Sequence, residues 1–183
     1  MSGDANVTQL LRRYCQGDTT AFSALSDLLY PELKSLAHRR VRPGQEIGAT
    51  TLVQETFIKL LSSGGVKPED RKQFFGLAAT IMRQVIIDDA RQAKTQKRQG
   101  LEVEYVPAIG RDDQQVNAEF LLRVNEALDR LAEQDKRLAQ VFEYRYFGGY
   151  SIAEIADILG SSERSAERFW SNARKFLAAQ LGR

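Results

Sequence analysis

The segment from Tyr150 to Leu181 constrains the fold most, because it holds two short helical patterns separated by one glycine. Its first half repeats Ile and Ala at spacings of three and four residues, which predicts a helix with one apolar face. Gly160 follows where a helix ends in a left-handed residue, and Ser161 or Ser162 can cap a second helix. A short helix, a tight turn and a second capped helix are typical of a helix-turn-helix.

The second helix of this segment has two chemically different faces. Small and apolar residues, Trp170 among them, recur in steps of three and four and predict a buried stripe. The opposite face has guanidinium groups suited to phosphates or guanine, and an amide suited to adenine. This pattern favours DNA recognition, although an ordinary amphipathic helix with a solvated face shares it. The candidate DNA-reading residues are Arg164, Glu167, Arg168, Ser171, Asn172 and Lys175.

Helical periodicity dominates the rest of the chain as well, and no run of alternating strand residues is convincing. We therefore expect an all-α protein of two small helical domains, residues 1–94 and 116–183, with the helix-turn-helix in the second. Residues 95–115 lose the helical pattern and mix Gly, Pro and charges, which predicts a flexible linker. Pro31 interrupts the second helical pattern and is expected to kink or divide that helix.

Composition and charge limit the class of protein. The single cysteine, Cys15, excludes an internal disulfide, and the first residues do not have the pattern of a signal peptide. No apolar run is long enough to span a membrane, so we expect a cytoplasmic protein. The net charge is only +2. Charge alone would therefore not hold this protein tightly on DNA, and another partner is expected to bring it there.

Nothing in the sequence predicts catalysis. His38 is the only histidine and has no fixed acid or cysteine partner. No His/Cys cluster has the spacing of a metal site, and no Gly-rich loop follows a strand. We therefore expect a protein that is not an enzyme and that uses no metal or cofactor.

Three segments in order resemble bacterial sigma factors of the extracytoplasmic-function (ECF) group. Residues 52–61, LVQETFIKLL, resemble the helix that binds core RNA polymerase. Residues 74–92 resemble the helix for the −10 promoter element, and residues 142–177 resemble the domain that reads the −35 element. The resemblance implies a protein that binds polymerase core and promoter DNA and initiates transcription. A low net charge fits, because the polymerase would bring the protein to the promoter.

The resemblance also assigns the contact with polymerase, which would involve the clamp helices of the largest subunit and the flap. Leu52, Val53 and Phe57 can alternatively be core residues, so Gln54 and Glu55 are the firmer surface contacts. The candidate core-polymerase-binding residues are Leu52, Val53, Gln54, Glu55, Phe57 and Ile58.

By the same resemblance, the helix for the −10 element would hold an unstacked promoter strand by its phosphates and capture a flipped base. Gln84 aligns with the position near that base. The alternative interpretation is a solvated helix end. The candidate residues are Lys72, Arg83, Gln84, Arg91 and Lys94.

The chain departs from the ECF pattern just before LVQET. Most members carry acidic residues there, whereas this chain has Gly48, Ala49, Thr50 and Thr51. Losing acids that face a basic clamp should weaken core binding. We hypothesise that a Ser/Thr protein kinase restores the charge by phosphorylating Thr51, or Thr50, near a helix N-terminus. The alternative is that one of these threonines is only an N-cap.

Two further alternatives concern the mode of action. A stand-alone helix-turn-helix regulator would bind duplex DNA without polymerase, but the N-terminal half offers no evident ligand site. An anti-sigma factor is a possible partner, although no dedicated docking segment is evident.

Overall fold

The computed structural model describes residues 2–39, 48–62, 68–99 and 118–182. In these residues the chain forms eight α-helices and no strand, so the all-α prediction is confirmed. The helices are α1 (Ser2–Cys15), α2 (Thr20–His38), α3 (Ala49–Ser62), α4 (Arg71–Arg98), α5 (Ala118–Gln134), α6 (Lys136–Tyr146), α7 (Ile152–Ile158) and α8 (Glu163–Leu181).

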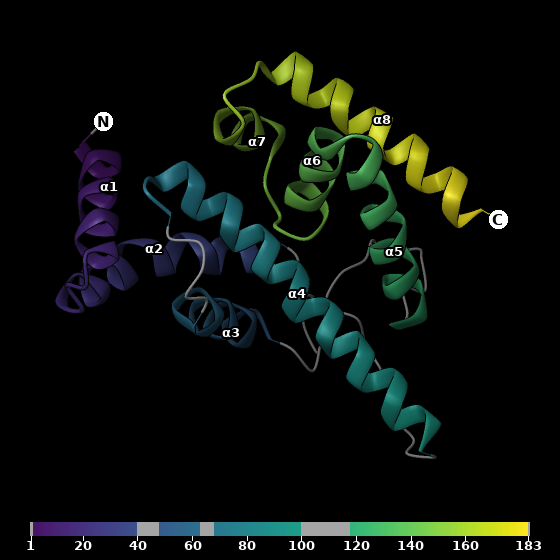
Figure 1. Ribbon diagram of the computed structural model, residues 1–183, viewed down its shortest axis with the longest axis horizontal. Helices are drawn as coiled ribbons and strands as arrows, with labels where there is room; N and C mark the ends of the chain where they lie inside the picture. The colour runs from purple at the N-terminus through teal and green to yellow at the C-terminus, as the bar shows by residue number, and fades with distance from the viewer. Residues whose placement is uncertain (1, 40–47, 63–67, 100–117, 183) are drawn as a thin grey trace.

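Helix α4 organises the molecule. It runs through the middle, with α1–α3 on one side and α5–α8 on the other (Figure 1). Its most buried side chains, including Ala79, Met82 and Ile86, are fully enclosed, because helices from both sides pack against it. The buried apolar residues form one continuous core that spans the N-terminal part (α1–α4) and the C-terminal part (α5–α8).

Helix α2 passes through Pro31 without a break, so the prediction of a divided helix is wrong. Proline inside a helix removes one backbone hydrogen bond and crowds the preceding turn. The apolar stripe of α2 nevertheless continues on both sides of the proline, and Leu25, Leu29, Leu33 and Leu36 are all buried. Packing of this stripe against the core keeps the helix in one piece, while Pro31 itself faces solvent.

The end of α4 lies beyond the predicted boundary of the first domain. The helix continues to Arg98, so residues 95–98 are helical and do not belong to a linker. The rest of the predicted linker lies almost entirely in residues 100–117, outside the described residues. Residues 40–47 and 63–67 lie outside them as well.

The local signals around α7 and α8 match the predicted two-helix pattern. Ser151 and Glu154 form a reciprocal capping box at the start of α7. Gly160 has a φ of +59°, a left-handed conformation that favours glycine and ends the helix. Ser162, not Ser161, caps α8 by accepting a hydrogen bond from the Ser165 backbone N–H. The assignment of this pair as a DNA-reading motif remains a prediction at this point.

Candidate nucleic-acid and polymerase interface

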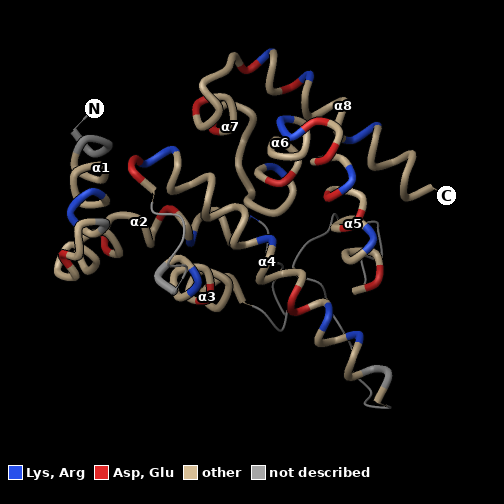
Figure 2. Tube along the Cα trace, in the orientation of Figure 1, with Lys and Arg blue, Asp and Glu red and all other residues tan. Residues whose placement is uncertain are grey.

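Helix α8 separates its two faces as the sequence predicts. Ala166, Ala173 and Leu177 are buried, and Trp170 stacks on Phe142 of α6 with 5.4 Å between ring centroids. Trp170 therefore packs against the core. Basic positions recur along the length of this helix (Figure 2). All six candidate DNA-reading residues are exposed, namely Arg164, Glu167, Arg168, Ser171, Asn172 and Lys175.

The exposed face of α8 has the dimensions of a groove reader. From Arg164 to Lys175 the helix rises about 16 Å at 1.5 Å per residue, which is the length of roughly five base pairs. The Arg168 guanidinium lies 5.5 Å from the Phe169 ring, and that of Arg174 lies 5.7 Å from the Trp170 ring. These ring contacts support the guanidinium groups while leaving both residues exposed.

Helix α3 presents only part of its predicted polymerase-binding set. Leu52 and Val53 are fully buried and Phe57 is 9% exposed. These three side chains serve the core, as the alternative interpretation held, and cannot reach a partner. Gln54 and Glu55 are exposed.

Ile58 adds an apolar group to the exposed face of α3. Its side chain is 54% exposed, which makes it one of two large exposed apolar residues in the described part of the chain. An apolar side chain next to an amide and a carboxylate is a composition suited to docking a protein partner.

An aromatic cluster explains why Phe57 points inward. Its ring lies between those of Phe22, Tyr30 and Phe74, with centroid separations of 6.1 to 6.4 Å. Such rings from α2, α3 and α4 bury large apolar areas and fix α3 against the other helices. The face with Gln54, Glu55 and Ile58 is thereby turned outward.

The candidate −10 residues on α4 fall into two groups. Lys72, Gln84 and Arg91 are exposed and Lys94 is half-buried. Asp88 lies beside this face and accepts from Arg91 at 3.1 Å and from Lys59 of α3 at 2.7 Å. The positive charge of this surface is therefore partly balanced from within the N-terminal part.

Arg83 differs from the other candidates because its side chain is only 16% exposed. Its guanidinium pairs with Glu143 of α6 at 2.8 Å and also with Asp129 of α5. Its Nε donates to the Asn125 side chain at 2.9 Å. Arg83 therefore faces the C-terminal part, and in this conformation it is not available to a nucleic-acid strand.

A polar cavity of about 400 Å³ lies between α4 and α5 beside Arg83. It brings together three of the candidate −10 residues with one acid and one amide from the opposite helix. The lining residues are Thr80, Arg83, Gln84, Ile87, Asp88, Arg91, Asn125 and Asp129.

Sequence reasoning missed the residues that hold Arg83. Glu143 is 8% exposed although it is charged, and Thr80 donates to it at 2.6 Å. Buried carboxylates need a partner, because an isolated charge is costly to remove from water. The only available signal was its position in α6 between Phe142 and Tyr144, which are both buried.

Within the described ranges, no three His, Cys, Asp or Glu side chains are placed to hold a metal ion. No helix among the described residues has the length and apolar character needed to cross a membrane.

Comparison with known protein families identifies the family of this chain. The family model for ECF sigma factors matches residues 4–183. The chain belongs to the ECF sigma factor family. A search of curated proteins found no match.

Family membership gives the general role of this sigma factor. It acts in transcription initiation, and its partners are RNA polymerase core and promoter DNA. The match covers both parts of the molecule, so the stand-alone regulator is set aside.

Proposed function

We propose that this sigma factor divides its contacts among three helices. In this proposal α3 docks on polymerase core, α4 meets the −10 element and α8 reads the −35 element. The observation that carries the proposal is the uninterrupted exposed polar face of α8, because a helix with a packed back and a free Arg/Asn front is suited to a major groove. The corresponding units are residues 1–94 and 116–183, joined through residues 95–115, with residues 95–98 continuing α4.

The proposed polymerase contact rests on Gln54, Glu55 and Ile58. All three are exposed on one helix that the aromatic cluster holds in place. The amide and the carboxylate suit a basic coiled coil such as the clamp helices, and Ile58 supplies apolar area at the same site. Replacing Ile58 with Ala should weaken core binding and leave folding nearly unchanged, because the side chain is more than half exposed.

The proposed −10 contact rests on the part of α4 that remains exposed. Gln84 offers an amide for a flipped base, and Arg91 offers a guanidinium for a phosphate of the single strand. Lys72 and Lys94 extend the positive charge toward the two ends of α4. Together these groups suit a strand that runs along the helix.

We further propose that phosphorylation controls the polymerase contact. Thr50 and Thr51 are exposed and lie in the first turn of α3, which begins at Ala49. Neither is the N-cap, because the Leu52 backbone N–H donates to the Gly48 carbonyl, which makes Gly48 the residue before the helix. The N-cap interpretation is therefore wrong.

The first turn of α3 is a favourable position for a phosphate. Backbone N–H groups are unpaired there and the helix dipole favours negative charge. The segment contributes no acid of its own in this turn. A phosphothreonine carries about −1.5 to −2 charge, so it would supply the charge that most family members have as carboxylates.

The test is core binding by the purified protein, with phosphothreonine installed at position 51 during translation. We expect binding to strengthen by at least ~5-fold over the unmodified chain, as for one close charge pair at an interface of about 1 kcal/mol or more. Phosphothreonine at position 50 and the variant Thr51→Ala are the matched controls. Equal binding with and without phosphate would disprove the switch and direct attention to an anti-sigma factor or to expression level. Failure of every form to bind core would contradict the α3 assignment itself.

A further inference from the structure

Asp88 lies in the middle of the face of α4 that is proposed to meet the promoter strand. It follows Gln84 by one helical turn and precedes Arg91 by one turn, so the three side chains share one side of the helix. A carboxylate at this place repels DNA phosphates. Its position between two groups assigned to DNA therefore indicates a role other than direct contact with the strand.

Both oxygens of the Asp88 carboxylate are engaged by cations, and the two cations come from different helices. Oδ1 accepts a hydrogen bond of 3.1 Å from the Arg91 guanidinium. Oδ2 accepts one of 2.7 Å from the Lys59 ammonium of α3. Two cations on one carboxylate leave the group positive, so it still attracts a phosphate.

Arg91 keeps donors for DNA while Asp88 holds it. A guanidinium has several N–H groups, and the contact with Asp88 uses Nη1. The Arg91 side chain is 61% exposed, so the rest of the group is accessible to a strand. A side chain that is already held in one orientation loses less conformational freedom on binding. Asp88 can therefore favour binding of a strand although its own charge opposes it.

Lys59 connects this pair to the helix that is proposed to dock on polymerase. It directly follows Ile58, whose exposed side chain belongs to the proposed docking face. Lys59 itself is 35% exposed. A partner that covers Ile58 removes water near Lys59, and an ion pair becomes stronger where water is removed. Docking on α3 thus acts on Asp88, and through it on Arg91, without a change in the backbone.

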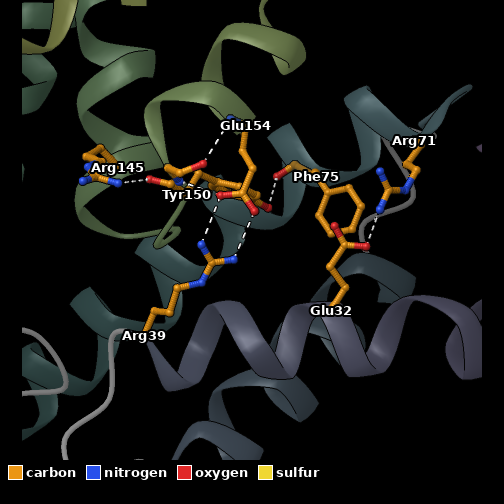
Figure 3. A network of polar contacts seen from close by, with 8 residues as sticks. Glu32, Arg39, Arg71, Phe75, Arg145, Tyr150 and Glu154 are labelled. Carbon is orange, nitrogen blue, oxygen red and sulfur yellow. Dashed lines mark hydrogen bonds and ion pairs between the residues drawn. The ribbon is translucent and has the colours of Figure 1, made fainter. Parts of the chain in front are cut away.

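The start of α4 is held by contacts that do not involve Asp88 (Figure 3). The Tyr150 hydroxyl donates to the Phe75 carbonyl of α4 at 2.9 Å. Arg39, at the end of α2, donates two hydrogen bonds of 3.1 Å to the Glu154 carboxylate of α7, close to the segment that carries Tyr150. These contacts fix the helix well before it reaches Asp88.

Close packing of α6 on the same part of α4 adds to this support. A Cβ atom built on Gly76 would lie 2.8 Å from the Tyr144 hydroxyl oxygen, and Tyr144 is 7% exposed. The absence of a side chain at position 76 therefore allows α6 to lie this close to α4. A substitution at Asp88 should then alter side-chain contacts and leave the helix in place.

From these contacts we propose that Asp88 is a positioning residue that couples polymerase docking on α3 to capture of the promoter strand by Arg91. The carboxylate orients the guanidinium, and Lys59 holds the carboxylate. Docking of core strengthens the contact with Lys59, so Arg91 is better ordered in the holoenzyme than in the free protein. The proposal rests on the roles proposed above for α3 and α4.

The test is binding of single-stranded DNA by holoenzyme, assembled from polymerase core with saturating amounts of the full chain. The probe is a fluorescein-labelled non-template strand of a promoter that the wild-type holoenzyme selects from a random library, and fluorescence anisotropy gives its Kd. Asp88→Asn keeps the shape of the side chain and removes its charge. We expect it to weaken binding by about 2- to 10-fold, the cost of ordering one long side chain. Asp88→Glu retains a carboxylate and should recover most of the affinity.

A double-mutant cycle distinguishes positioning from a general effect on the fold. Arg91→Gln removes the proposed strand contact, and adding Asp88→Asn to it should weaken binding no further, because Asp88 acts through Arg91. Lys59→Gln should weaken strand binding as Asp88→Asn does. Asp27→Asn makes the same chemical change at an exposed position of α2 and is the matched control, which should bind as the wild type does.

The outcomes separate this proposal from the roles of α3 and α4. Strand binding by Asp88→Asn that equals or exceeds that of the wild type would overturn the positioning role, as would additive losses in the double variant. An unaffected Lys59→Gln would overturn the coupling to α3. An unaffected Arg91→Gln would contradict the −10 role of α4 and the positioning role with it, and a wild type that never binds core would contradict the role of α3. Melting curves by circular dichroism confirm that each variant is folded.

Discussion

Helices α8 and α4 carry similar polar side chains, but they differ in what lies opposite. Every candidate residue of α8 faces solvent, whereas Arg83 of α4 is enclosed by acids of α5 and α6. Helix α8 packs on α5, α6 and α7 through one face, while the central α4 has neighbours on several sides. The comparison shows that a polar stripe on a helix marks a binding surface only when no other part of the chain covers it.

The largest expected effect comes from removing Arg83. Arg83→Ala leaves the buried Glu143 without its cation between α4 and α6, and we expect a loss of about 3 kcal/mol in the free energy of unfolding. The equivalent change on α8, Arg168→Ala, should alter it by less than ~0.5 kcal/mol because that side chain is exposed. Urea denaturation of both variants checks the difference. Equal losses of stability in the two variants would show that the burial of Arg83 does not make it more important for folding than the exposed Arg168.

The next largest effect is expected in recognition of the −35 element during transcription. Arg168→Ala should weaken recognition of the −35 element by about 1–3 kcal/mol and relax specificity at one position, if the side chain contacts a base edge. The measurement is transcription in vitro from a promoter library with reconstituted holoenzyme. Arg174→Ala is a neighbouring control, because Arg174 lies over Trp170. A uniform decrease over all sequences would instead indicate a phosphate contact.

A smaller effect concerns the exposed ion pair between the start of α4 and α7. The Lys72–Asp157 pair is more than half exposed on both sides, so Asp157→Asn should lower the free energy of unfolding by about 0.2–1 kcal/mol. The change should be greatest at low salt and should diminish as salt screens the pair. Urea denaturation over a salt series measures it. A variant with the same salt dependence as the wild type would exclude a role for this pair.

The smallest effect is the pH dependence of the Arg39–Glu154 contact. Burial raises the pKa of Glu154, but hydrogen bonds from Arg39 and from Ser151 outweigh it and hold the pKa at about 2, below the ordinary 4.5. A carboxylate with a lowered pKa stabilises the folded form fully above about pH 4.5 and loses that contribution as the pH falls toward 2.

The contribution of this contact to stability should therefore be constant at neutral and mildly acidic pH. Arg39→Gln removes the cation but leaves the capping box of α7 intact, so it should reduce the acid dependence between pH 4.5 and 2. Acid unfolding followed by circular dichroism compares the variant with the wild type. Identical curves would show that Arg39 does not set the pKa of Glu154.

The sequence predicted the structure correctly where the determining signal lies within a few residues. Helical periodicity predicted the all-α fold, and the Gly160 and Ser162 signals located the junction of α7 and α8, because a left-handed glycine and a capping hydroxyl act within a few residues. The outward face of α8 followed from the same periodicity.

Signals that depend on distant neighbours were missed. Pro31 did not divide α2, because packing on both sides of it outweighed a local preference. The burial of Arg83 and Glu143 could not be inferred, since the two residues are 60 positions apart and pair only when α6 lies on α4. Likewise, the sequence did not decide which apolar residues of α3 face inward, because that depends on the aromatic rings supplied by α2 and α4.

The contact between Gly76 and Tyr144 also has a consequence for how this sequence can diverge. An added methyl at position 76 needs a smaller or displaced side chain at position 144, since only 2.8 Å separates the hydroxyl oxygen from the place of a Cβ atom. The two positions, 68 residues apart, should therefore vary together among descendants that keep this packing. A lineage that acquires a larger residue at position 76 without a compensating change would lose the close packing of α6 on α4.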